Sequence, residues 1–198
     1  MKSPVHLTLA ASLALLLSGT VRAADYLIDT KGAHAFIQFH IKHLGYSWLV
    51  GRFNRFGGEF SYDAADPEAA KVTVTIDTAS IDSNHAERDK HLRDEDFLEV
   101  DRFPEARFVS TSYRDLGDGK GELIGDLTLH GVTRPLTIDV THIGGGEDPW
   151  GGYRRGFDGR TRFALADFGI KRDLGPASLY THPTSQAMRD YLAGRLAP

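Results

Sequence analysis

Few residues in this sequence could perform nucleophilic catalysis. The chain contains no Cys, and no Gly-x-Ser-x-Gly segment presents a nucleophilic serine. Ser110 and Ser112 fall in a predicted strand, and no spacing connects them to a His and an acid. We therefore expect no catalytic residues of this class.

The nine His residues are the remaining candidates for metal binding or acid–base chemistry. In a strand, His40 and His43 would lie on opposite faces because their offset is odd. On a helix, His85 and His91 would point to different sides. Neither pair makes a ligand set alone, although His34, His43 and His91 could converge in the fold. A metal-dependent or His/Asp-based enzyme is therefore the alternative to a binding protein, and no metal site is assigned.

A charged helix is predicted from residue 84 to residue 92. Asn84 followed by Glu87 resembles a capping box, and Pro104 ends the helical region. The spacing places Arg88 and Asp89 on one helix face, together with His85 and Leu92. We favour a structural role for this pair, as an ion pair or hydrogen-bond set that holds the helix over one end of a barrel. The alternative is that the pair lines the mouth of the barrel and meets the polar head of a ligand.

The elements around this helix alternate apolar and polar residues with period two, which is typical of half-buried antiparallel strands. Residues 46–50 read as a short turn or helix, and Gly57-Gly58 as a bulge or bend inside the following strand. Several strands with one helical insertion predict an all-β fold, an antiparallel meander closed into a barrel. Strands are expected at 25–29, 37–42, 51–62, 71–77, 106–113, 122–129, 135–143 and 153–165.

Large apolar residues share one face of these strands. They could fill the barrel as a packed core, or they could line a cavity, since a barrel of about eight strands permits both. Apolar walls with few polar groups suit a long hydrocarbon chain. The residues of this face are Ile37, Phe39, Ile41, Phe53, Phe56, Val74, Ile76, Phe108, Leu127, Leu136, Ile138 and Phe163.

Residues 1–23 have the pattern of a secretory signal peptide, with Lys2 near the start, an apolar run at 7–17 and small residues before a cleavage site near Ala23. This run is too short to span a bilayer, so we expect an exported protein without stable membrane insertion, forming one domain from 24 to 198. Removing Lys2 and Arg22 changes the net charge from −4 to −6. An acidic chain without a basic run is an improbable partner for nucleic acid.

Three long segments, at 34–53, 84–104 and 125–140, carry a resemblance to a known family. Their sequences are HAFIQFHIKHLGYSWLVGRF, NHAERDKHLRDEDFLEVDRFP and GDLTLHGVTRPLTIDV, and shorter matches occur at DPWGG, RRGF, DFGIK and DLGPAS. Together they resemble the YceI-like family, whose RD-x-HL element Arg88 and Asp89 match. A long ordered series of matches is more specific than any single motif.

The resemblance implies a periplasmic, lipocalin-like barrel that binds an isoprenoid lipid, either a polyprenol or the tail of a quinone. It implies no catalytic residue and no cofactor other than such a lipid. It also implies a link to alkaline or osmotic stress, which no residue encodes. The oligomeric state is open, with a homodimer as one option. In the implied tunnel the lipid tail would meet Ile37, Phe39, Ile41, Phe53, Val74, Phe108 and Ile138, with Trp48 and Phe97 near the entrance.

The C-terminus departs from the family pattern after residue 178. The family continues there with an alternating strand, whereas this chain has an atypical tail from 179 onward in which Pro183 excludes a central strand. Ser185 as a cap, with Met188, Tyr191 and Leu192 at i, i+3 and i+4, predicts a short amphipathic helix that ends at Gly194. The barrel is therefore expected either to lack its closing strand or to have the resulting edge covered by this helix.

Overall fold

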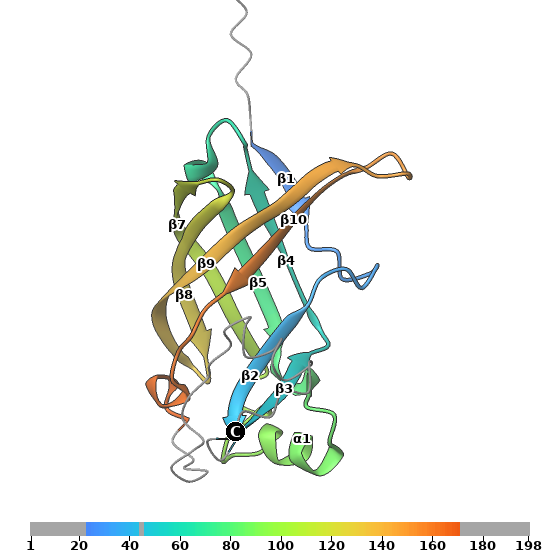
Figure 1. Cartoon of the computed structure of the whole chain (residues 1–198). Coiled ribbons are helices and arrows are strands. Elements are labelled where there is room, and N and C mark those ends of the chain that lie inside the picture. The colour runs from blue at the N-terminus through green and yellow to red at the C-terminus, as the bar shows by residue number, and fades with distance from the viewer. Residues whose placement is uncertain (1–22, 44–45, 171–198) are drawn as a thin grey trace, which may run out of the picture.

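The structure, a computed structural model, describes residues 23–43 and 46–170, so the predicted signal peptide (all but residue 23) and the tail from 179 lie outside the described residues. A seven-stranded antiparallel sheet curls into a half-barrel (Figure 1), which confirms the predicted all-β antiparallel fold with a helical insertion. Its strands, in spatial order, are β1 (Ala24–Leu27), β4 (Phe56–Tyr62), β5 (Lys71–Asp77), β7 (Glu105–Gly117), β8 (Lys120–Leu129), β9 (Val132–Glu147) and β10 (Tyr153–Arg160).

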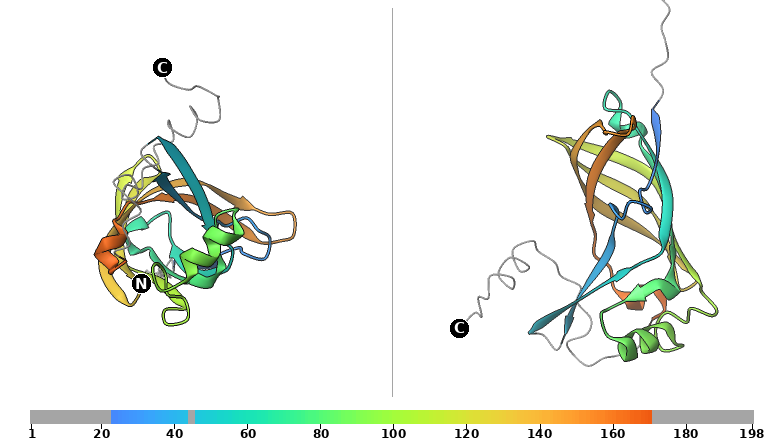
Figure 2. Two further views of the ribbon diagram at one scale, coloured as in Figure 1. Left: turned by 90° about the horizontal axis from the view of Figure 1, so that it is seen from below. Right: turned by 90° about the vertical axis from the view of Figure 1, so that its right-hand side faces the viewer.

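A second, three-stranded sheet stands apart from the half-barrel in its backbone pairing. It consists of β2 (Ile37–His43), β3 (Ser47–Phe53) and β6 (Ile81–Asp82). Figures 1 and 2 show β2 and β3 beside the lower part of the curled sheet, with the helix α1 (Ala86–Arg93) below them. Three short 3-10 helices complete the fold: η1 (Pro67–Ala69), η2 (Thr78–Ser80) and η3 (Leu165–Phe168). No helix among the described residues is long and apolar enough to cross a bilayer.

The segment from 46 to 62 forms two strands in different sheets, so the predicted turn at 46–50 and single strand at 51–62 are wrong. β3 pairs with β2 along its whole length, and Gly51 belongs to it. A Cβ at Gly51 would lie 2.2 Å from the Phe39 ring, so this glycine makes room for an aromatic side chain on β2. The chain passes between the sheets at Asn54 and Arg55, whose backbone amides donate to the carbonyl and hydroxyl oxygens of Ser80.

Gly57 and Gly58 do not form the predicted bulge. β4 keeps an unbroken register with β5 through both residues. A Cβ at Gly58 would lie 2.1 Å from the carbonyl oxygen of Thr73. The glycine therefore permits a close approach of two backbones. A glycine inside a strand often marks either a bulge or such an approach.

The N-cap of the helix α1 lies one residue later than predicted, at His85 in place of Asn84, and the helix itself begins at Ala86. Asn84 has a φ of 61°, in the left-handed region, whereas an N-cap residue needs an extended backbone. His85 meets this requirement with a φ of −153°, and its Nδ1 accepts a hydrogen bond from the backbone amide of Arg88.

Arg88 and Asp89 both form hydrogen bonds with Ser83, the residue that follows β6. The buried carboxylate of Asp89 accepts hydrogen bonds from the amide and the hydroxyl of Ser83. The Arg88 guanidinium donates to the hydroxyl and the carbonyl oxygen of the same residue, at 2.7 and 2.6 Å. These contacts fix α1 to the three-stranded sheet, as in the structural role that we favoured from the sequence.

The two ends of the half-barrel are closed by different elements. At the α1 end the buried side chains include Phe97, Leu98, Phe168 and Ile170. At the opposite end, which we call the η1 end, η1 joins β4 to β5 and Ala70 is buried. The concave face between these ends must therefore be covered by something other than the helices.

We predict that Asp89→Ala lowers the free energy of unfolding by about 1–3 kcal/mol, because it leaves the amide and hydroxyl of buried Ser83 without their acceptor. Urea unfolding of purified protein measures this effect. The control, Lys90→Ala, changes an exposed position of the same helix and should alter stability by less than about 0.5 kcal/mol. Wild-type stability in Asp89→Ala would contradict the structural role.

Candidate functional site

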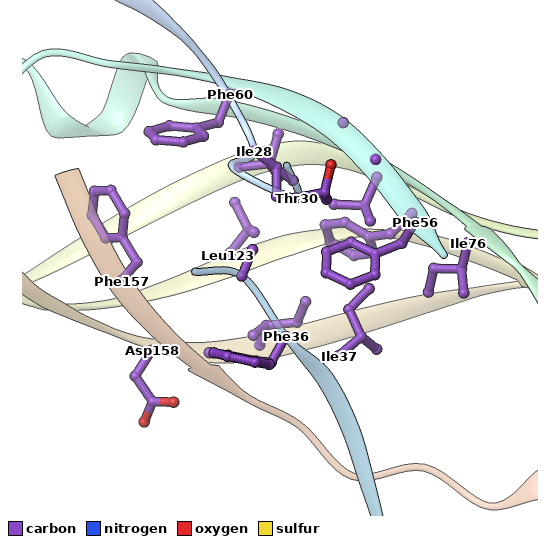
Figure 3. A pocket seen from close by; sticks show the side chains of 18 of the residues that line it. Ile28, Thr30, Phe36, Ile37, Phe56, Phe60, Ile76, Leu123, Phe157 and Asp158 are labelled. Atoms are coloured by element: carbon purple, nitrogen blue, oxygen red, sulfur yellow. The ribbon is translucent and has the colours of Figure 1, made fainter. Parts of the chain in front are cut away.

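The concave face of the half-barrel lines a cavity of about 2180 Å³ that is partly open to solvent. Figure 3 shows side chains from β2, β4, β5, β8 and β10 around it, nearly all of them hydrocarbon. The alternation of β5 explains the wall locally, since Val72, Val74 and Ile76 all point inward as the period of two predicts. Further walls come from Phe108, Leu123, Leu127, Leu136, Ile138 and Val140 on β7, β8 and β9.

The structure places eight of the nine predicted tunnel residues on this cavity. Trp48 is the exception, since it lies on β3 opposite Lys42 and does not line the cavity. Phe97 lines the cavity from the buried α1 end. Whether a lipid contacts these side chains stays a prediction. The eight lining residues are Ile37, Phe39, Ile41, Phe53, Val74, Phe97, Phe108 and Ile138.

Several aromatic residues of the wall were missed as site residues by the sequence reasoning. Phe60 and Tyr62 share the inward face of β4 with Phe56, so the period of two could have identified both. Phe157 could also have been found in this way, because it shares a face of the predicted strand 153–165 with Phe163, and the extra residue at the register shift, Ile143, belongs to β9. Tyr113 is buried on β7, beyond a register shift at 110–112.

The edge strands of the sheet meet through side chains at the η1 end. The ring of Phe157 on β10 packs edge-on against the rings of Phe60 and Tyr62, at 5.6 and 5.2 Å between centroids. Arg155 donates a 3.0 Å hydrogen bond to the hydroxyl of Tyr26 on β1, and its guanidinium lies 4.9 Å from the centre of the Tyr62 ring. We call these five residues the seam.

A polar cluster continues the closure outside the seam. The Asp29 carboxylate contacts Nδ1 of His34 at 2.9 Å, accepts from the amide of Gly32, and pairs with Arg154, which also pairs with Asp148 at 2.8 Å. The hydrogen bond with His34, followed by those from Gly32 and Arg154, holds the pKa of the Asp29 carboxyl well below its usual range. The contacts connect the segment after β1 to the β9–β10 hairpin.

The cavity opens to solvent along β2 and β10, where the lining residues become polar and exposed. Asp158 and Arg160 form an ion pair there at 2.9 Å, with about half of each side chain exposed. His40 on β2 faces the same opening, and partial burial together with the charge of Arg160 lowers its pKa. Figure 3 shows Asp158 at the edge of the pocket, away from the apolar walls.

The histidines predicted as metal candidates lie in separate places. His34 contacts Asp29, whereas His91 lies 3.9 and 3.4 Å from the carboxylates of Asp94 and Asp96. The last three residues form the one group among residues 23–43 and 46–170 that could hold a metal ion, and the sequence reasoning did not identify it. Arg88 and Asp89 do not line the cavity.

Comparisons with known proteins give a consistent result. The YceI-like domain family matches residues 26–185. A UPF0312 protein of Shewanella denitrificans is 63% identical over 164 residues, covering 83% of this chain and 86% of that protein, and one of Shewanella oneidensis is 62% identical over 158 residues, covering 80% and 83%. The Campylobacter jejuni YCEI protein has a similar structure, with a TM-score of 0.63 at 28% identity over 79% of this chain and 92% of that chain. Burkholderia cenocepacia BcnA, at 22% identity and a TM-score of 0.66 over 74% and 86%, shares the fold.

We predict that Ile138→Glu weakens the binding of an isoprenoid hydrocarbon by a factor of at least about ten, because a bound tail would cover an unpaired carboxylate. Fluorescence displacement measures the affinity. Thr137→Glu is the matched control, since the neighbouring residue on β9 is exposed and does not line the cavity. Equal affinities for the two variants would show that the tail does not reach this wall.

A second prediction concerns the polar cluster. Because the folded-state pKa of Asp29 is lowered, its contribution to stability is present above the ordinary Asp pKa of about 3.9 and is lost as the pH falls through the depressed value. Carboxyl NMR should show Asp29 titrating below the ordinary range, and His34→Ala should raise its pKa. Arg102→Ala, distant from the cluster, should leave it unchanged. An Asp29 titration in the ordinary range would mean that the cluster does not form in solution.

Proposed function

This chain belongs to the YceI-like family, and on that premise we propose that it is a periplasmic binding protein that carries an isoprenoid lipid in the cavity of its half-barrel. The lipid would be a polyprenol or a quinone with an isoprenoid tail. The signal-peptide pattern at 1–23 supports export, and the sequence resemblance supports the ligand class. No chemical step is part of the proposed mechanism.

The observation that carries this proposal is the size and lining of the cavity. Its volume of about 2180 Å³ is twice the upper end of the roughly 300–1,000 Å³ that hold ordinary small ligands. The walls along β4, β5, β7 and β8 are almost entirely apolar, so each methylene that leaves water there would contribute ~0.8 kcal/mol to binding. A long chain without polar groups uses such a space better than a compact polar substrate does.

Burial alone would then hold the tail, and the opening along β2 and β10 would admit it. The charged residues of that opening are exposed and partly paired with one another, so they do not have to be desolvated when the tail enters. The seam would keep the η1 end closed. The protein would release the lipid through the same opening.

Mass spectrometry of the protein, purified after expression with its own N-terminus and then denatured, tests this function. We expect an isoprenoid lipid at about one molecule per chain, reduced in Ile138→Glu and retained in Thr137→Glu. The same sample measures metals by elemental analysis. A stoichiometric metal without lipid would contradict the proposal and favour the metal-dependent alternative, with His91, Asp94 and Asp96 as its first candidates.

A further inference from the structure

Two tyrosine hydroxyl groups lie at the apolar η1 end of the cavity. Tyr113, on β7, is 9% exposed and lines the cavity. Its ring crosses β8 above Gly121, where a Cβ would come within 2.0 Å of the Tyr113 hydroxyl oxygen. Glycine at this position therefore leaves the space that the phenol occupies. Packing therefore fixes the position of the Tyr113 hydroxyl, whereas an exposed side chain could adopt several positions.

Tyr62, on β4, lines the same end of the cavity. It is close enough to Tyr113 that the charge of its phenolate would raise the pKa of that neighbour. Neither hydroxyl has a hydrogen-bond partner within the described part of the chain. The ring of His142 lies 5.7 Å from the Tyr62 ring, and its buried Nε2 also has no partner among these residues.

Both hydroxyls therefore face the space of the cavity, where a bound molecule can reach them. A polar group that a ligand cuts off from water without replacing its hydrogen bond costs free energy. Here the two tyrosine hydroxyls lie at one end of a largely apolar cavity. A ligand that brought an oxygen atom to this end would supply the missing partner, whereas a pure hydrocarbon would leave the hydroxyls unpaired.

We propose that Tyr62 and Tyr113 form a subsite for the uncharged oxygen-bearing head group of the lipid, a quinone carbonyl or an alcohol. The inference rests on the proposed function and deepens it. It also assigns an orientation, with the head group at the η1 end and the tail directed toward the α1 end and the opening along β2 and β10.

The protonated tyrosine hydroxyls of the subsite suit a neutral oxygen-bearing head group. Burial, then the neighbouring Tyr62 and Asp115, raise the pKa of Tyr113, so its hydroxyl stays protonated and can donate at neutral pH. Asp115 would repel an anion. The Arg155 guanidinium is held by the hydroxyl of Tyr26 and by the rings of Tyr62 and Tyr153, and it keeps its positive charge, so an isoprenyl diphosphate is the competing ligand in the test.

Three ligands and three variants test the subsite. The ligands are a quinone with an isoprenoid tail, an isoprenoid hydrocarbon without a head group and an isoprenyl diphosphate. The variants Tyr62→Phe and Tyr113→Phe remove one hydroxyl each without changing the ring, and the matched control Tyr46→Phe removes one from an exposed residue that does not line the cavity. Thermal melting of each variant verifies that it is folded.

Each cavity variant should weaken the binding of the quinone by about threefold to tenfold, the effect of one hydrogen bond, and leave that of the hydrocarbon unchanged. Tyr46→Phe should change neither. An equal loss for quinone and hydrocarbon, or no loss for the quinone, would overturn the subsite, as would wild-type protein that binds the diphosphate more tightly than the quinone. If wild-type protein binds none of the three ligands, the proposed function itself fails.

Gly121→Ala tests the same subsite without removing a hydroxyl. The added methyl would lie too close to the Tyr113 oxygen and displace it, so we expect the same selective loss of quinone binding. Thr137→Ala is the control, since this residue is exposed and does not line the cavity. Unchanged quinone binding in a folded Gly121→Ala protein would contradict the placement of the Tyr113 hydroxyl.

Discussion

The fold depends on how the apolar concave face of an open sheet is covered. Among the described residues β1 and β10 are the edges of the seven-stranded sheet, and no backbone hydrogen bonds join them to each other. In a closed barrel the two edge strands would pair through backbone hydrogen bonds. Here side chains join the edges at the η1 end, where Phe157 packs on Phe60 and Tyr62. At the α1 end the three-stranded sheet and the buried residues around Phe97 cover the face. What is left between them is the cavity.

The sequence predicts those parts of the fold in which local pattern and tertiary environment agree. β5 is an example, since Val72, Val74 and Ile76 alternate without interruption and all three line the cavity. The prediction of strand boundaries and bulges fails where a glycine makes room for a neighbouring group and does not mark a turn. Gly51 makes room for the ring of Phe39, and Gly58 for the carbonyl of Thr73, and neither neighbour can be known before the register is known. The predicted N-cap of α1 was also wrong. Asn84 has a left-handed backbone, which the sequence does not reveal, and His85 is the capping residue.

The candidate site was predictable in its apolar walls and not in its polar end. An inward stripe on a strand is visible in the sequence, although its function as core or as cavity wall is not. Tyr113 reads as an ordinary strand residue, and only its position over Gly121 and beside Tyr62 shows a hydroxyl inside the cavity. A tail held by burial is bound with little selectivity, since apolar contact is not directional. The few polar groups of such a pocket therefore decide which lipid is preferred.

The measurement that tests the central claim most directly is NMR of the isotope-labelled protein bound to an unlabelled quinone with an isoprenoid tail. We predict nuclear Overhauser contacts between the tail and the methyl groups of Val74, Leu127 and Ile138. We also predict contacts between the quinone ring and the rings of Tyr62 and Tyr113. Tail contacts confined to exposed residues such as Leu116 and Ile143, with none to the cavity wall, would contradict it.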